Sequence, residues 1–95
     1  MKPSIGRIVI YNTTEQDQQA MRDQKINVQK QLPAMIVAVW SDDCINVKVF
    51  MDGGVPDVWK TSIHEYIKPV VADGLELDIS LPNKEGTWEW PTIIK

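Results

Sequence analysis

Hydrophobic and polar positions along the chain form short alternating or apolar runs, a pattern that predicts β-strands separated by tight turns. Four runs rich in β-branched residues are predicted as strands, namely Ile5–Tyr11, Leu32–Trp40, Cys44–Asp52 and Asp57–Tyr66. The second run is apolar almost throughout, which predicts burial on both faces, with Pro33 at its entrance. Polar turn residues follow it, so the second and third strands are expected to form a hairpin.

The expected faces follow from the two-residue period of a strand. In the third strand, Ile45, Val47, Val49 and Met51 are predicted on one face. In the fourth strand, strict alternation separates two sets of side chains: Val58, Lys60, Ser62 and His64 against Trp59, Thr61, Ile63 and Glu65. Lys60 and Thr61 are therefore expected on opposite faces, where they cannot both reach one ligand.

Two further strands are predicted near the end of the chain. Apolar residues alternate with polar ones from Leu75 to Leu81, which is typical of a half-buried strand. The closing stretch Gly86–Pro91 carries Trp88 and Trp90, which share a face if this stretch is extended. That pair of indoles is either part of the core or a platform on which a flat ligand stacks.

The polar stretch after the first strand contains no Gly or Pro and predicts a short helix over about Thr14–Gln24. Thr13, followed three residues later by Gln16, fits a capping box at its start. Met21 is the expected anchor of the helix to the rest of the protein. Because the apolar stripe is thin, the helix is expected on the surface, inside an inserted segment of about residues 13–31.

Five or six short strands with one inserted helix predict a mainly β protein. We expect a single domain over residues 1–95, folded as a small antiparallel half-open barrel of the Src-homology and Tudor kind. An oligonucleotide-binding barrel is the alternative. It is less favoured because the strands are short and the helix follows the first strand rather than the third.

Composition narrows the classes of partner. The formal net charge is −3, and this argues against nonspecific binding of duplex DNA, which needs a basic surface. No apolar run is long enough to cross a bilayer and the N-terminal stretch does not read as a signal peptide, so a cytoplasmic location and no membrane partner are expected. One cysteine and one histidine give neither a disulfide nor a zinc quartet, and no cofactor is expected.

Catalytic chemistry is the minority interpretation. Cys44 and His64 form a nucleophile and base only if the fold brings them within hydrogen-bond reach. Asp42, Asp43, Asp52 and Asp57 are possible ligands of a divalent cation, but aspartate beside glycine is also ordinary turn chemistry. No phosphate-binding glycine loop or serine elbow occurs, so the sequence predicts a protein that is not an enzyme.

The stretches IGRIVIY, LPAMIVAVWSDDCINVKVFMDGG, VWKTSI and GTWEWP, in this order, resemble a group of small phage and prophage proteins of largely unknown function. The resemblance covers both ends and the middle of the chain, about half of its residues. Its members close with a Gly-Thr-Trp-x-Trp-Pro motif that matches the stretch Gly86–Pro91 here. The resemblance does not extend to residues 70–84, where shorter members run almost directly into the tryptophan strand.

The resemblance implies a role in binding, since some small phage β proteins sequester the cyclic oligonucleotide signals of bacterial antiviral defence. A nucleobase needs an aromatic face and phosphates need cationic or hydroxyl donors. The candidate aromatic residues are Tyr11, Trp59, Trp88 and Trp90, and the candidate donors are Arg7, Lys48, Lys60, Thr61 and Ser62. A homo-oligomer in the host cytoplasm is expected, because one small barrel face rarely encloses a ligand.

Each candidate residue also has a structural interpretation. The tryptophans can serve as core, because a small domain needs large side chains to bury enough area. Arg7 can pair with an acidic neighbour instead of a phosphate. The alternative function is a protein-interaction module that engages a host or phage protein through the helix or an aromatic groove.

Overall fold

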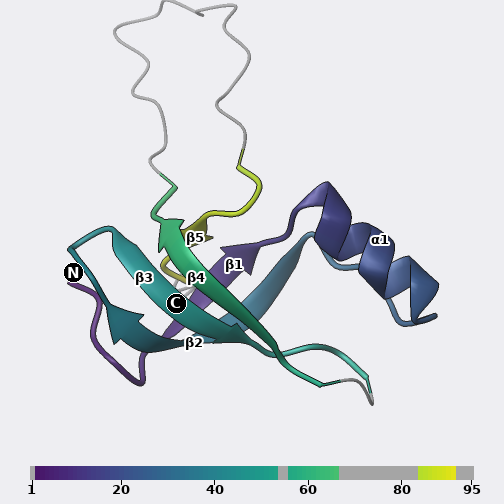
Figure 1. The fold of residues 1–95 in the computed structure, drawn as a ribbon, viewed down its shortest axis with the longest axis horizontal. Helices are drawn as coiled ribbons and strands as arrows, with labels where there is room; N and C mark the ends of the chain where they lie inside the picture. The colour runs from purple at the N-terminus through teal and green to yellow at the C-terminus, as the bar shows by residue number, and fades with distance from the viewer. Residues whose placement is uncertain (1, 54–55, 67–83, 92–95) are drawn as a thin grey trace, which may run out of the picture.

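Residues 2–53, 56–66 and 84–91 of the 95-residue chain are described by the computed structural model. Within these residues the chain forms one antiparallel sheet in the order β4-β3-β2-β1-β5 (Figure 1). Its elements are β1 Ile8–Asn12, α1 Glu15–Asp23, β2 Gln31–Val39, β3 Cys44–Val49, β4 Val58–His64 and β5 Trp88–Glu89. This architecture confirms the mainly β prediction with one inserted helix. No helix in the described ranges is long and apolar enough to cross a membrane.

The sheet curls until its two edges meet at one end. Tyr11 in β1 pairs with Trp88 in β5, and Glu65, just after β4, bridges the same Trp88. The backbone N–H of Tyr66 donates to the carbonyl of Trp88 at 2.8 Å. β5, at one end of the strand order, thus also contacts the chain just after β4, at the other end. The sheet is therefore a half-open barrel, as the sequence predicts.

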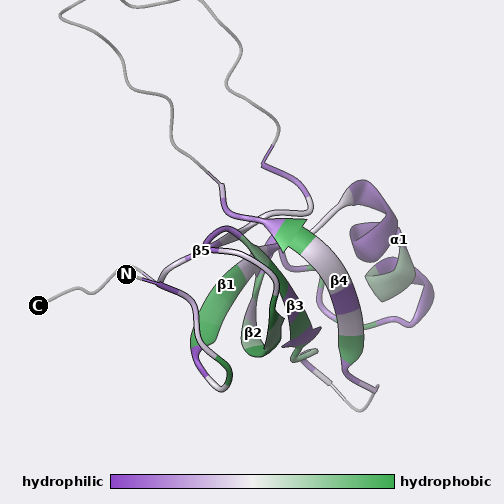
Figure 2. Ribbon diagram, turned by 60° about the vertical axis from the view of Figure 1, so that its left-hand side comes forward, coloured by the Kyte–Doolittle hydropathy of each residue, from purple (hydrophilic) through white to green (hydrophobic). Residues whose placement is uncertain are grey.

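The core fills the concave side of this half-barrel. Three of the four residues predicted on one face of the third strand, Ile45, Val47 and Val49, are buried on this side, whereas β3 ends at Val49 and so does not reach Met51. Hydrophobic residues gather on the strands, while α1 is largely hydrophilic (Figure 2). The buried apolar side chains are Val9, Tyr11, Met21, Leu32, Ala34, Ile36, Ile45, Val47, Val49, Ile63 and Trp88.

Two strand predictions are corrected by the structure. β1 begins at Ile8 rather than Ile5, because Gly6 adopts a φ of +93° in a turn closed by a bond from the Arg7 N–H to the Ser4 carbonyl at 3.2 Å. The run in β2 is not buried on both faces, because Pro33 and Met35 are exposed. An antiparallel sheet with one face toward the core gives this alternation even in an apolar sequence.

Strict alternation in β4 is also wrong. Lys60 pairs with Val47 and Ile63 pairs with Ile45, so three residue steps in β4 match two in β3. This β-bulge places Ser62 at a φ of +53° and turns Ile63 into the core. Val58, Lys60 and Ile63 therefore share the inner face instead of standing on opposite faces.

The helix is confirmed, with its cap one residue later than predicted. Thr14 is the N-cap, its hydroxyl accepts from the Asp17 N–H at 3.1 Å, and the Asp17 carboxylate accepts from the Thr14 N–H at 2.9 Å. Thr13 instead donates its hydroxyl to the Gln29 carbonyl. Met21 is buried, as expected of the anchor. The predicted strand from Leu75 to Leu81 lies outside the described residues.

Candidate functional site

The nine predicted binding residues fall into three separate groups in the structure. One group points into the barrel mouth beside α1, a second lies on the outer face of β3 and β4, and a third lies where the chain before β1 meets β5. The groups are, in that order, Tyr11 and Lys60; Lys48, Trp59, Thr61 and Ser62; and Arg7, Trp88 and Trp90. The structure therefore does not gather all nine residues around one cavity or on one face of the sheet.

The two closing tryptophans do not form one flat platform. Trp88 is 0% exposed and donates its indole N–H to the Asp43 carbonyl at 2.8 Å, so it is a core residue with no face for a ligand. Trp90 meets it edge-on, with ring centroids 5.4 Å apart and planes at 85°. The strand ends at Glu89, and the alternation that would align the two indoles ends with it.

Arg7 lies over the ring of Trp90, with its guanidinium carbon 5.3 Å from the ring centroid. This cation–π contact engages Arg7 within the protein. Trp90 is partly buried against the core. The third group is therefore engaged in packing.

The second group lies on the outer face of the sheet, where it is joined by a residue that the sequence interpretation left out. Lys48 and Trp59 are direct register partners across β3 and β4, and Thr61 is the next outward residue along β4. Trp59 is 55% exposed and Trp40, at the end of β2, is 66% exposed. We call Trp40, Lys48, Trp59 and Thr61 the tryptophan patch.

Asn46 organises the tryptophan patch from beneath. Its side-chain oxygen accepts three hydrogen bonds, from the Trp40 indole N–H at 2.9 Å, the Thr61 hydroxyl at 3.0 Å and the Ser62 backbone N–H at 2.8 Å. Asn46 is only 6% exposed. One buried amide thus fixes an exposed indole, a hydroxyl and the β4 bulge relative to one another, which pre-organises the surface.

An apolar row extends the tryptophan patch across the sheet. Ile8 pairs with Met35, Met35 with Lys48, and Lys48 with Trp59, so the four side chains stand in one line on the outer face. Ile8, Met35 and Trp59 are all large apolar residues exposed to solvent. Lys48 is the only charged side chain in the row, and no ion pair engages it within the described residues.

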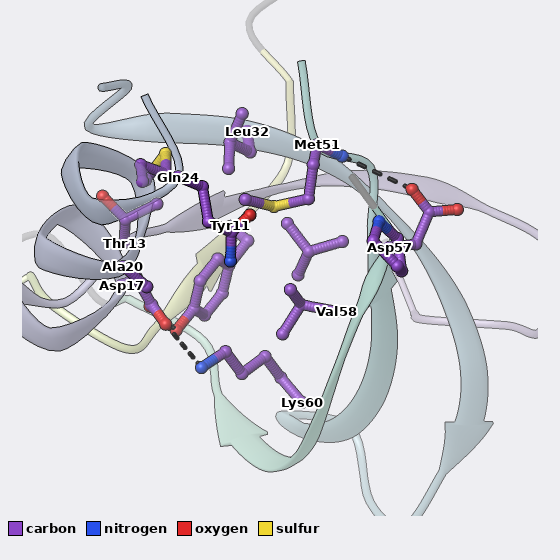
Figure 3. A pocket seen from close by; sticks show the side chains of 13 residues that line it. Tyr11, Thr13, Asp17, Ala20, Gln24, Leu32, Met51, Asp57, Val58 and Lys60 are labelled. Atoms are coloured by element: carbon purple, nitrogen blue, oxygen red, sulfur yellow. Dashed lines mark hydrogen bonds and ion pairs between the residues drawn. The ribbon is translucent and has the colours of Figure 1, made fainter. Parts of the chain in front are cut away.

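The first group lines a cavity of about 390 Å³ between α1 and the inner face of the half-barrel (Figure 3). Tyr11, Leu32 and Val58 give it apolar walls, and Lys60 crosses one end to reach Asp17 on the helix. A volume of this size is within the range of small-molecule sites. Its lining, however, offers few polar groups that lack a partner.

Asp17 is the hub of the polar end of this cavity. It accepts from the Lys60 ammonium at 2.6 Å, the Tyr11 hydroxyl at 2.6 Å and the Thr14 N–H at 2.9 Å. Burial acts to raise the pKa of Asp17, but the hydrogen bonds from Lys60, Thr14 and Tyr11 outweigh it and hold the pKa below its usual value. Burial and the bond to this carboxylate raise the pKa of the Tyr11 phenol. Lys60 therefore serves first to tie β4 to the helix.

The structure brings the two residues of the catalytic alternative, Cys44 and His64, onto neighbouring strands as register partners but does not join them by a hydrogen bond within the described residues. The imidazole Nδ1 instead lies 3.1 Å from an Asp43 carboxylate oxygen. That contact, followed by the bond from Ser41, holds the pKa of Asp43 below its usual value.

The aspartates that the sequence raises as metal ligands do not converge in the structure. Asp52 accepts from the Asn27 side chain, whereas Asp57 accepts from the Met51 N–H. In the part of the chain that the structure describes, no three His, Cys, Asp or Glu side chains are placed to hold a metal ion.

Comparison of the chain with protein-family models, with curated proteins and with solved structures finds no match in any of the three. The likeness to phage proteins thus stays a prediction.

Proposed function

We propose that the protein is a non-enzymatic binding protein that captures a nucleotide-like molecule on the tryptophan patch. The observation that carries the proposal is the direct pairing of Lys48 with the exposed Trp59 on one face, with the Thr61 hydroxyl beside them. A nucleotide needs this combination, since its base stacks on an aromatic ring and its phosphate accepts from a cation or hydroxyl.

The energetics of the patch suit such a ligand. Stacking of one base on an indole contributes about 1–3 kcal/mol. The bond from Trp40 to Asn46 holds a second indole near the same surface before any ligand arrives, so less side-chain entropy is lost on binding. Lys48 is the cation available on this face, whereas Lys60 is held inside the barrel by Asp17.

A cyclic oligonucleotide of host antiviral defence is the ligand that the phage resemblance suggests, and it combines two or more bases with phosphates. The patch is open to solvent on one copy of the chain. A homo-oligomer in the host cytoplasm, with a second copy covering the ligand, is part of the proposal because an open face encloses little of a ligand's surface.

A second candidate function is docking of a protein partner on the outer face. The apolar row through Ile8, Met35 and Trp59 favours it, because exposed Trp and Met are typical of the centre of an interface. Lys48 would then face an acidic residue of the partner.

The test is a thermal melt of the whole chain with a panel of cyclic dinucleotides and trinucleotides. A ligand at about one hundred times its Kd stabilises a protein by about 2.7 kcal/mol, which raises the Tm of a domain of this size by about 10–20 °C. Trp59→Ala and Lys48→Gln should each weaken binding about tenfold in a titration. Ile5→Ala and Lys30→Gln remove an exposed apolar and an exposed cationic side chain elsewhere and should leave it unchanged.

The proposal fails if no member of the panel shifts the Tm, or if Trp59→Ala binds a ligand as tightly as the parent chain does. In the first case the protein-docking candidate takes its place. In that candidate, Met35→Glu should abolish association with the partner, since it puts a charge into the apolar row.

A further inference from the structure

The strand β4 forms one edge of the sheet, because only β3 lies beside it in the strand order. β5 meets the chain only past the end of β4, through Glu65 and Tyr66. Along Val58–His64, the backbone groups on the side away from β3 therefore have no strand partner among the described residues. A free edge of this kind is a template onto which another extended segment can pair.

The cavity beside α1 opens next to the first half of this edge. Val58 and Lys60 line it from β4, and Ala20 lines it from the helix, which stands across the opening (Figure 3). The deeper walls are mostly apolar. Successive side chains of an added strand point to opposite faces, so alternate side chains would be directed toward the cavity.

The charges around the cavity differ between its two ends. At one end the Lys60 ammonium is neutralised by Asp17 at 2.6 Å. At the other, Asp57 lines the cavity. Its carboxylate is in no ion pair within the described ranges. This end of the cavity is therefore negative and complements a lysine or arginine.

We propose that the edge of β4 and the cavity beside α1 together form a docking groove for an extended segment of a partner protein. The segment adds as a strand to β4, places an apolar side chain in the cavity and directs a basic side chain toward Asp57. Backbone hydrogen bonds along the edge supply affinity, while the cavity and the Asp57 carboxylate select the sequence. The cavity lies on the inner side of the sheet, whereas the tryptophan patch lies on its outer face.

A synthetic peptide tests the groove directly. The probe is the acetylated and amidated heptapeptide Thr-Lys-Val-Leu-Val-Lys-Thr, in which the leucine and both lysines share one face of an extended strand. We expect saturable binding to the full chain and slower amide hydrogen exchange of the β4 residues in the complex. The same peptide with glutamate in place of both lysines should bind at least tenfold more weakly.

Variants of the protein locate the peptide. Ala20→Trp fills the cavity from the exposed helix surface and should weaken binding at least tenfold, whereas Gln19→Trp adds the same side chain outside the cavity and should not. Asp57→Lys should weaken the lysine peptide and strengthen the glutamate peptide, which keeps the test valid if Ala20→Trp does not fold.

Absence of saturable binding would overturn the proposal. So would binding that is unaffected by both Ala20→Trp and Asp57→Lys but lost in Trp59→Ala, because the peptide would then sit on the outer face.

Discussion

Replacing Asn46 by alanine removes the one acceptor that links the end of β2, the β4 bulge and the outer face. The variant leaves the Trp40 indole N–H, the Thr61 hydroxyl and the Ser62 backbone N–H without their common partner. Trp40 and Thr61 are exposed and can turn to water. The Ser62 N–H belongs to a residue whose φ of +53° is sparsely populated, so the Asn46 bond helps to hold a conformation that is otherwise unfavourable.

The magnitude follows from these partners. A part-buried backbone N–H left without an acceptor costs about 1–3 kcal/mol, and the two exposed donors add little. We therefore expect Asn46→Ala to lower the free energy of unfolding by about 2 kcal/mol. For a chain of 95 residues this lowers the Tm by about 8–16 °C. The variant should also release Trp40 from its fixed orientation, which shifts its fluorescence emission toward that of a fully solvated indole.

Circular dichroism melts and urea unfolding measure the loss, and two variants control for it. Thr61→Val removes a single exposed donor and should cost less than about 1 kcal/mol. Asn46→Asp keeps an acceptor oxygen for the three donors but puts a charge at a buried position, so it should destabilise the chain less than Asn46→Ala does near neutral pH without matching the parent chain. An Asn46→Ala variant that melts together with Thr61→Val would refute the assignment of Asn46 as the organiser of the bulge.

Three further predictions concern the helix and the core. Asp17→Asn should make the free energy of unfolding less dependent on pH in acid. Because folding lowers the pKa of Asp17, its carboxylate stabilises the fold above the unfolded pKa of about 3.9, and this stabilisation is lost as pH falls through the folded pKa. The free energies of unfolding of parent and variant should therefore converge in urea melts at acid pH. Met21→Ala should cost about 2–5 kcal/mol and increase hydrogen exchange in α1, whereas an unchanged Tm would show that Met21 does not anchor the helix. Trp88→Ala should cost about 3–5 kcal/mol and Trp59→Ala about 0.5 kcal/mol or less, and equal losses in urea unfolding would contradict the burial difference between the two indoles.

The fold was predictable from the sequence where a local rule decides it. Alternating apolar residues placed the third strand and its inner face, because antiparallel pairing with one face toward the core imposes that period. The helix and its anchor Met21 followed from polarity and the lack of Gly and Pro. Its cap was misplaced by one residue, since both Thr13 and Thr14 can accept from a helix N–H, and the bonds of Thr13 to the carbonyls of Gln29 and Lys30 are not visible in the local sequence.

The candidate site was less predictable because it depends on contacts between strands. Lys48, Trp59 and Thr61 were identified by residue type. The sequence of β4 alone does not indicate its bulge, because the bulge is stabilised by the side chain of Asn46 on β3. Trp40 was taken as the end of an apolar strand, and its exposure follows from the turn that begins at Ser41. A polar residue inside the alternating third strand, at Asn46, was the one available signal of this network.

The β4 bulge connects the stability of the fold with the surface that we propose for binding. In a strand without the extra residue, even-numbered and odd-numbered positions face opposite sides. Val58 and Lys60 would then lie on one face and Ile63 on the other, so one of the two sets would point away from the core. With the extra residue, both halves of β4 point apolar side chains inward and Lys60 reaches Asp17. Trp59 and Thr61 then stand outside beside Lys48. The same local distortion that completes the core therefore separates an interior lysine, which secures the helix, from an exterior lysine that remains available to a ligand.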